Sequence, residues 1–534
     1  MSQLRQTSWE FFGVVCVGIA ALVITAMNLG GCNSSSQSAG SSPDNHPIHT
    51  PATNYIFVGN DVNHGNEIWK SDGTAAGTVM LKDIYPGPSS SNLGSVCFVK
   101  MNGIAYFVAD DYDHGYELWR TDGTTDGTQM VLDINPGIGF SNPGCPVVLG
   151  NVLYFVASDG VYGYETWRSD GTAAGTFLLK DINPGIASSQ AMNLVSANGL
   201  LYFVADDGSH GYELWVSDGT TLGTRMLGDI RAGAQGSSIS WLFAAKDGVY
   251  FSADDGTHGL ELWHSDGTPT GTSIVKDINP GVDNSVPWDL VMMGDVLYFS
   301  AYVGYDQQLW RSDGSANGTY PVQNILSPLL ANSPNFLTEV NGKIFFNAWS
   351  NLYGWELWSS DGTSAGTAMV KDISTDIGGS NPTYLTRVGQ RLFFTASQNG
   401  VSEVWRSDGT EAGTVKVQDV NGVSIGVSFN FVDVNGIAYF TGADTAGHGV
   451  ELWRSNGTPA GTWLVKDINL NGSSYITAIM PISSTLVFFA ANDGVHGYEL
   501  WTTDGTTQNT AMVLDIATGG QAGYSQTIPG VNLP

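Results

Sequence analysis

The chain has 534 residues, of which 20 are Lys or Arg and 50 are Asp or Glu, so its formal net charge is −30. A surface this acidic repels phosphate backbones, which argues against nucleic acid as a partner. Hydrophobic residues make up 42% and charged residues 13%, while Gly occupies 68 positions. This composition favours many short strands joined by tight turns over amphipathic helices.

The N-terminal segment has the features of an export signal. Residues 11–27 form an uncharged apolar stretch that is short for a membrane-spanning helix. The Leu-Gly-Gly-Cys sequence that follows, ending at Cys32, resembles the bacterial lipobox, in which small residues precede a cysteine that is lipidated. The resemblance implies a signal peptide over residues 1–31 and a lipid on Cys32. Because Asn33 follows instead of Asp, it also implies an outer-membrane or cell-surface lipoprotein. An uncleaved anchor helix is the alternative.

The segment after the cysteine predicts a linker. Residues 32–54 are rich in Ser, Asn and Pro and nearly free of large apolar side chains. A segment of this composition cannot form a packed core, so we predict a flexible tether. Residues 55–534 then form the folded domain.

A repeat of about 48 residues fills that domain. Ten tryptophans recur at spacings of 47 to 50 residues: Trp69, Trp119, Trp167, Trp215, Trp263, Trp310, Trp358, Trp405, Trp453 and Trp501. Each unit contains four short apolar runs separated by Asn-Gly, Asp-Gly and Asn-Pro-Gly turn signals, with no helical period. This pattern predicts an antiparallel meander of four strands, A to D, followed by a crossover to the next unit. Repeated four-stranded units of this length are typical of an all-β fold, the β-propeller.

The two ends of the repeat array predict a closed ring. The first unit begins at strand B, near Tyr55, and the last unit ends strand D at Leu514–Ile516. The C-terminal residues 524–528 resemble a strand A that completes the first blade and removes an open sheet edge. We therefore expect one ten-bladed ring. Two five-bladed rings and an open solenoid are the alternatives, and the lack of a linker near residue 290 disfavours two rings.

The units resemble those of the bacterial ELWxxDGT-repeat family, surface or exported proteins sometimes called hyalin-like. The resemblance covers about residues 55–516. It implies a propeller-like fold and export, and it implies no enzyme activity.

The polar residues that recur in the repeat are predicted to be structural. Nine units carry Glu two residues before the Trp, and nine carry Asp in the Ser-Asp-Gly-Thr turn, where the tenth has Asn456. Exchange of a carboxylate for an amide keeps an acceptor oxygen, which suits hydrogen bonds to backbone better than catalysis. Six units also carry a His, such as His210. We expect these histidines to tie strands together, as in WD-type propellers.

Two further sets of residues allow a structural and a functional interpretation. Acidic pairs in the B–C loops are weak candidates for a calcium site, although no EF-hand pattern is present, and no cofactor is otherwise expected: Asp110, Asp111, Asp206, Asp207, Asp254 and Asp255. Cys97 and Cys145 occupy equivalent positions of consecutive units. Such positions are expected to lie too far apart for a disulfide, so we predict two small buried side chains.

Units six to eight depart from the consensus together. Their B–C loops lack the acidic pair and the His, and two of them gain aromatic residues, which are candidate partner contacts: Tyr302, Tyr305, Trp349, Tyr353 and Trp355. Repeat drift with inward packing is the alternative. We expect a monomeric, membrane-tethered recognition or scaffold protein that binds a protein or polysaccharide through face loops, without catalytic residues. A glycosidase- or lyase-like propeller enzyme with a central-channel site, or a purely structural envelope protein, are the competing interpretations. Asp289 and Glu339 are the singular acids in the strand A set.

Overall fold

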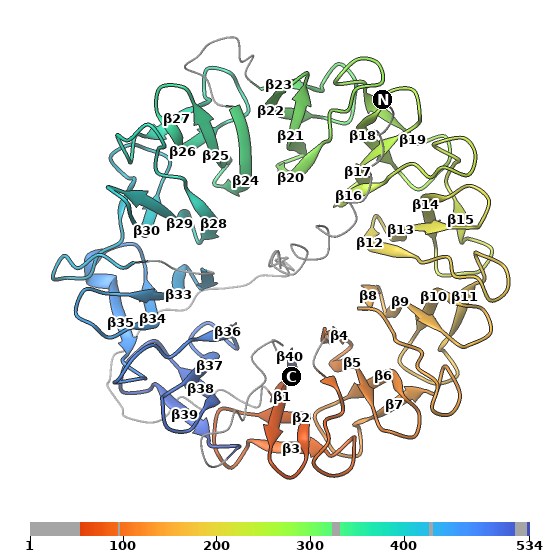
Figure 1. Ribbon diagram of the computed structural model, residues 1–534, viewed down its shortest axis with the longest axis horizontal. Coiled ribbons are helices and arrows are strands. Elements are labelled where there is room, and N and C mark those ends of the chain that lie inside the picture. The colour runs from red at the N-terminus through yellow and green to blue at the C-terminus, as the bar shows by residue number, and fades with distance from the viewer. Residues whose placement is uncertain (1–53, 94–96, 323–331, 427–430, 518–530, 534) are drawn as a thin grey trace, which may run out of the picture. The chain divides into compact units, whose positions relative to one another are not determined.

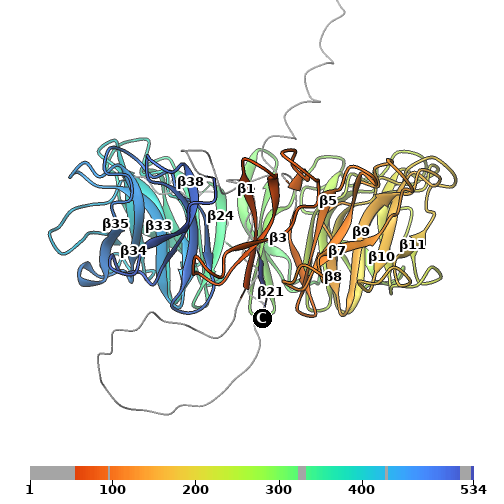
Figure 2. The same cartoon turned by 90° about the horizontal axis from the view of Figure 1, so that it is seen from below.

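The computed structural model describes residues 54–93, 97–322, 332–426, 431–517 and 531–533. Within the compact unit Thr50–Pro534, ten four-stranded antiparallel sheets stand side by side as the blades of a single ring. Figure 1 shows the ring along its axis, and Figure 2 shows it edge-on, with the strands running between its two faces. The ten-bladed β-propeller predicted from the repeat is confirmed, and the alternatives of two five-bladed rings and an open solenoid are wrong.

In every blade, strand A lies innermost and strand D lies outermost. From A to D, blade 1 is β40 (Val531–Leu533), β1 (Asn54–Asp61), β2 (Gly65–Ser71) and β3 (Val79–Lys82). Blade 2 is β4 (Val99–Met101), β5 (Ile104–Asp110), β6 (Tyr116–Thr121) and β7 (Gln129–Leu132). Blade 3 is β8 (Val147–Leu149), β9 (Val152–Ser158), β10 (Tyr164–Ser169) and β11 (Phe177–Lys180). Blade 4 is β12 (Met192–Ala197), β13 (Leu200–Asp206), β14 (Tyr212–Ser217) and β15 (Arg225–Met226). Blade 5 is β16 (Ser240–Ala245), β17 (Gly248–Asp254), β18 (Leu260–Ser265) and β19 (Thr272–Lys276).

The second half of the ring repeats this arrangement. Blade 6 is β20 (Trp288–Met293), β21 (Val296–Val303), β22 (Asp306–Ser312) and β23 (Tyr320–Pro321). Blade 7 is β24 (Asn332–Val340), β25 (Lys343–Ser350), β26 (Gly354–Ser360) and β27 (Ala368–Lys371). Blade 8 is β28 (Thr383–Val388), β29 (Arg391–Gln398), β30 (Val401–Ser407) and β31 (Val415–Lys416). Blade 9 is β32 (Val432–Val434), β33 (Ile437–Ala443), β34 (Val450–Ser455) and β35 (Thr462–Lys466), with a 3-10 helix at Pro459–Gly461. Blade 10 is β36 (Thr477–Pro481), β37 (Val487–Asn492), β38 (Tyr498–Thr503) and β39 (Ala511–Leu514).

The ring is closed by the C-terminal strand, as the sequence predicts, but a different segment forms it. β40 pairs antiparallel with β1, with Asn54 opposite Leu533 and Ile56 opposite Val531. The predicted closing segment, 524–528, lies outside the described residues. A three-residue strand gives no periodic signal in the sequence, so only the closed ring shows which segment meets β1. Pairing removes the open edge that a three-stranded blade would present.

The core lies between the blades. Strands B and C are largely buried on both faces because a neighbouring blade covers each face. Tyr202 and Val216 of blade 4, for example, share one buried cluster with Phe251 and Trp263 of blade 5. The repeated Trp residues are at most 9% exposed. The fold is thus held by nearest-neighbour packing around the ring.

A lysine joins each odd-numbered blade to the blade that follows it. Thirteen residues after the repeated Trp, blades 1, 3, 5, 7 and 9 carry a Lys whose ammonium group donates to a carbonyl oxygen in the C–D turn of the next blade at 2.7–3.1 Å: Lys82, Lys180, Lys276, Lys371 and Lys466. The even blades carry other residues at this position: Leu132, Gly228, Gln323, Gln418 and Leu514. The ten blades are therefore five lysine-joined pairs.

The antiparallel meander gives the ring two different faces. B–C loops and D–A crossovers lie together on one face, which we call the crossover face, where the Asn66 carbonyl accepts a hydrogen bond from the Ser91 amide at 3.1 Å. A–B and C–D turns lie on the opposite face, the turn face, where the Asn198 side chain donates to the Asp266 carbonyl at 3.1 Å. The A strands, including β12, β16, β20, β24 and β28, form the inner wall (Figure 1).

Candidate functional site

Eight of the nine repeated Glu side chains accept hydrogen bonds from backbone amides of the crossover, and Glu403 instead pairs with Lys416. Glu67 is fully buried, and its carboxylate accepts hydrogen bonds from the backbone amides of Ile84 at 2.8 Å and Ser91 at 3.1 Å. Both amides belong to the crossover between blades 1 and 2, so one carboxylate holds two points of it. Burial raises the pKa to about 7 for five of these residues: Glu67, Glu117, Glu213, Glu261 and Glu451. The prediction of a structural, backbone-bonding role is confirmed.

The Asp of the Ser-Asp-Gly-Thr turn also accepts hydrogen bonds, in this case from within its own turn. Asp72 accepts hydrogen bonds from the amide and the hydroxyl of Thr74, at 2.8 and 2.7 Å. Asn456, the exception in the sequence, accepts the same two bonds from Thr458, at 3.0 and 2.7 Å. An acceptor oxygen at this position is therefore sufficient, and the negative charge is not required.

The repeated histidines are paired within their own loops, and the expectation that they tie strands together is wrong. His210 Nδ1 lies 2.8 Å from the Asp207 carboxylate, three residues earlier in the same B–C loop. Five other loops contain the same pair, as at His64 and Asp61. The partners are three residues apart, or four at Asp444 and His448, so each pair closes within one tight loop. Hydrogen bonding to Asp207 raises the pKa of His210.

The acidic pairs proposed for calcium are engaged with backbone amides. Asp206 accepts a hydrogen bond from Gly208 at 2.8 Å, and Asp207 accepts from Ser209 at 2.9 Å. Equivalent bonds are made in the other two loops by Asp110, Asp111, Asp254 and Asp255. Within the described part of the chain, no group of three or more His, Cys, Asp or Glu residues could hold a metal ion. Calcium binding stays a weak prediction.

The aromatic residues proposed as partner contacts differ in how far the structure exposes them. Trp349 and Trp355 lie opposite each other at the B–C hairpin of blade 7, with ring centroids 5.9 Å apart in an edge-to-face arrangement, and both are partly buried. Tyr302 and Tyr353 are also partly buried. Tyr305 alone is fully exposed, in the loop between β21 and β22. The crossover face of blades 6 and 7 thus presents one free ring and one packed aromatic pair.

A second group of aromatic residues, not predicted from the sequence, lies on the inner wall. Among the described inner strands, six contain a bulge, and the residue at the bulge has a positive φ of 51–60°: Asn193, Trp241, Asp289, Phe336, Tyr384 and Ala478. Trp241 is 54% exposed and Phe336 is 48% exposed. Comparing the residues at this one position of the repeat across the units would have identified them, because large aromatic residues replace small or polar ones at that position.

The inner edge of the ring also contains the two repeat cysteines, and the prediction that they are unpaired and buried is wrong. Cys97 and Cys145 form a disulfide between blades 2 and 3, with their Cα atoms 5.8 Å apart. Each precedes the inner strand of its blade by two residues, and neither is buried. Neighbouring blades converge toward the axis, which brings equivalent positions on the inner edge within bonding distance.

The two acids singled out in the sequence for the inner strands bind neighbouring blades; β32 carries a further acid, Asp433. The Asp289 carboxylate of β20 accepts a hydrogen bond from the Leu337 amide of β24 at 2.8 Å, and burial raises its pKa to about 6. Glu339 of β24 forms an ion pair with Arg387 of β28 at 2.6 Å. Each acid therefore ties one blade to the next.

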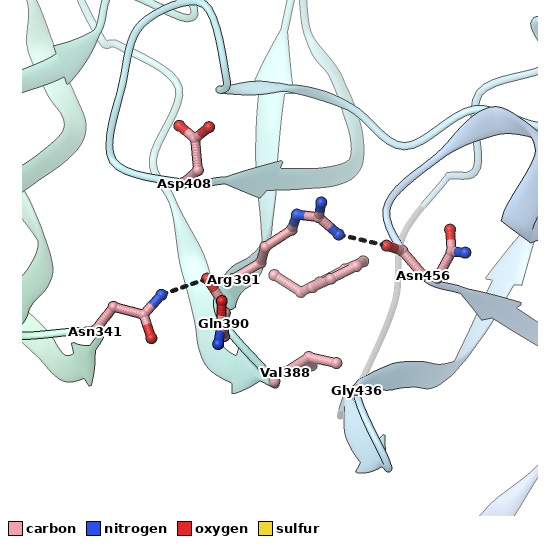
Figure 3. Close-up of a pocket in the computed structure, with 9 residues that line it drawn as sticks. Asn341, Val388, Gln390, Arg391, Asp408, Gly436 and Asn456 are labelled. Carbon is pink, nitrogen blue, oxygen red and sulfur yellow. Dashed lines mark hydrogen bonds between the residues drawn. The ribbon is translucent and has the colours of Figure 1, made fainter. Parts of the chain in front are cut away.

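A polar pocket of about 520 Å³ lies where blades 7, 8 and 9 meet on the turn face (Figure 3). Its lining includes Asn341, Gln390, Arg391, Asp408 and Asn456. Figure 3 shows Arg391 extending to the Asn456 carbonyl, at 2.8 Å, and the Asn341 amide donating to the Gln390 carbonyl, at 2.7 Å. The polar groups of this pocket thus join three blades.

The predicted membrane attachment concerns residues that the structure does not describe. Among the described residues, no helix is long and apolar enough to cross a membrane. Residues 1–53, with the apolar stretch 11–27 and Cys32, lie outside them. Lipidation and the flexible tether therefore stay predictions.

The fold defines the chain as a ten-bladed β-propeller, and the comparisons with known proteins add no narrower class. No family model and no curated protein matches it. Among solved structures, the chain is similar to one from a study of two prolyl endopeptidases, with 11% identity and a TM-score of 0.34, over 66% of this chain and 54% of that one. A puromycin hydrolase shows 15% identity and a TM-score of 0.30, over 70% and 60% of the two chains. The chain spans about half the length of the first of these, and likenesses this distant carry no argument about function.

Proposed function

We propose that this protein is a membrane-tethered, extracytoplasmic recognition or scaffold protein that binds a protein or a polysaccharide. One observation carries the proposal. The repeated Glu, Asp and His side chains are bonded within the blades and their loops, whereas large aromatic side chains are exposed where the blades differ, as at Trp241 and Tyr305. Exposed aromatic side chains on a rigid scaffold are typical of binding surfaces.

The architecture supports this function physically. A closed ring of ten packed blades holds its loops and inner wall in fixed positions, so little ordering entropy is lost when a ligand binds. Lipidation of Cys32 and a tether over residues 32–54 would hold this platform at a membrane while leaving it free to turn. A closed ring also lacks an open sheet edge at blade 1, which favours a monomer.

The competing enzyme interpretation requires titratable groups that converge on a substrate. Asp289 and Glu339, its candidates, each hold a neighbouring blade: one through the Leu337 amide and the other through Arg387. Their placement supports a role in the scaffold.

The proposal is tested with the detergent-solubilised full chain on a glycan array, and by chemical cross-linking on intact cells followed by mass spectrometry. We expect selective retention of a glycan class or recovery of a specific protein partner. Absence of both would overturn the proposal. Release of shortened glycan products on prolonged incubation would instead establish the enzyme interpretation.

A further inference from the structure

Four consecutive blades place aromatic side chains on the inner wall of the ring. They are Trp241 of β16, Trp288 of β20, Phe336 of β24 and Tyr384 of β28. In the described inner strands, aromatic residues occur in these four and in no others. The Trp241 and Trp288 rings meet across two blades with centroids 6.3 Å apart. We call this set the inner aromatic arc.

Neither the backbone nor the core explains Trp241 and Phe336, whereas Tyr384 also packs against the core cluster around Phe393. Trp241, Phe336 and Tyr384 have φ of 54°, 60° and 54°, a region in which a bulky residue is unfavourable. The same bulge contains Asn193 in blade 4 and Ala478 in blade 10, so the fold accepts a small residue there. About half of the surface of Trp241 and of Phe336 is exposed, so burial does not require them either.

The surroundings of the arc indicate an uncharged ligand. Its four strands contain three charged residues, and each has a partner: Asp289 binds the Leu337 amide, and Glu339 pairs with Arg387. The remaining residues of these strands are aromatic, aliphatic, hydroxyl or amide residues. The net charge of −30 further disfavours an acidic polymer.

We propose that the inner aromatic arc binds a neutral polysaccharide chain, with sugar rings stacked on Trp241, Trp288, Phe336 and Tyr384. Sugar rings present apolar C–H faces that pack on aromatic rings and hydroxyl groups that bond to amides and hydroxyls, which is the combination of groups on this wall. The inference deepens the proposed recognition function, on which it rests, by naming the ligand class and by placing the site on the inner wall instead of the face loops.

The experiment is affinity electrophoresis of the detergent-solubilised full chain in gels containing laminarin, dextran, xyloglucan or mannan, with alginate as an anionic comparison. We expect retardation by at least one neutral polymer and none by alginate. Trp241→Asn and Phe336→Asn should each weaken binding at least tenfold. Because Asn occupies the equivalent bulge in blade 4, both variants should keep the thermal midpoint of the parent protein.

Two control variants distinguish binding at the inner wall from binding at the face loops. Ala478→Asn changes the same bulge in blade 10, outside the arc, and Tyr305→Ala removes the exposed ring of the crossover face. Both should bind like the parent protein. If Tyr305→Ala alone abolishes binding, or if the arc variants bind normally, the inner-wall site is overturned while the recognition function stands.

Two further outcomes also decide the question. No retardation by any neutral polymer, or retardation by alginate alone, overturns the ligand class. If a cross-linked protein partner is lost in Trp241→Asn while no glycan binds, the wall binds polypeptide and the glycan proposal is wrong. Only the absence of both glycan and protein ligands would overturn the recognition function as well.

Discussion

The ammonium group of Lys180, at the end of blade 3, donates a hydrogen bond to the Thr224 carbonyl of blade 4 at 2.7 Å. The same group lies 5.7 Å from the centroid of the Trp215 ring. Its charge is thus shared between the C–D turn and the repeated Trp of the neighbouring blade. Because the position is Lys in every second blade only, this contact joins blades in pairs.

We predict that Lys180→Met lowers the thermal midpoint, with a cost of roughly 1–2 kcal/mol for the lost charged hydrogen bond and cation–π contact. Met keeps the apolar stem, so the change isolates the ammonium group. Differential scanning calorimetry measures the effect. Lys246→Met is the control, because Lys246 is exposed in an A–B turn and should leave the midpoint unchanged. Equal effects at both positions would contradict the lysine-joined pair.

Stability should fall as the pH rises from about 4.5 to 7. Burial raises the pKa of Glu213 and four equivalent residues from 4.5 to about 7, so the folded protein binds more protons than the unfolded chain in this window. Uptake of protons on folding makes the free energy of unfolding decrease with rising pH. The His–Asp loops act in the same direction, because the raised pKa of His210 adds stability below about 6.5 that is lost at higher pH.

The measurement is the thermal midpoint at pH 5, 6, 7 and 8 at constant ionic strength. We expect the highest midpoint at pH 5 and a steady decline above it. Repetition at high salt separates the buried carboxyl groups from general repulsion among surface acids, because salt screens only the exposed charges. A midpoint that rises toward pH 8 would show that the buried Glu side chains are ionised without penalty.

Loss of the disulfide should destabilise blades 2 and 3. Cys97 and Cys145 are 48 residues apart, and opening a loop of this length costs roughly 2–4 kcal/mol through the entropy of the unfolded chain. The double variant Cys97→Ser, Cys145→Ser should therefore have a lower thermal midpoint than the parent protein. Reductant should lower the thermal midpoint of the parent protein and leave that of the double variant unchanged. Two reactive thiols in the denatured, unreduced domain would show that the bond is absent.

Removal of the closing strand should open the ring. A chain ending at residue 530 lacks β40, and this leaves β1 as an exposed edge with unpaired backbone groups. We expect a lower thermal midpoint and concentration-dependent self-association in size-exclusion chromatography. A chain lacking Pro534 alone is the control and should behave like the full chain. A monomeric, equally stable product of the longer truncation would refute closure by β40.

Lipidation is predicted to depend on Cys32 alone. In cells grown with labelled palmitate, the full chain should carry the label and Cys32→Ser should not. Cys16→Ser changes the other N-terminal cysteine and should keep the label. Label that survives in Cys32→Ser would contradict lipidation at Cys32, and a full chain without label would favour the uncleaved anchor helix.

The sequence by itself determined the blade and the number of blades. The spacing of Trp residues, the Asp-Gly and Asn-Gly turns and the short apolar runs between them are local signals, and they recur along the chain. The structural role of Glu67 and Asp72 was also predictable, because Gln308 replaces the repeated Glu in unit six and Asn456 replaces the repeated Asp in unit nine, so an acceptor and not a charge is required.

Only the tertiary structure decided what happens where the blades converge. The closing strand at Val531–Leu533, the bond between Cys97 and Cys145 and the exposed ring of Trp241 all depend on how the inner edges of different blades meet. These residues are far apart in the sequence or in irregular strands, and no local periodicity reports their distance. The candidate site was therefore predicted on the loops of blades 6 to 8, while the ring geometry also exposes aromatic side chains on the inner wall.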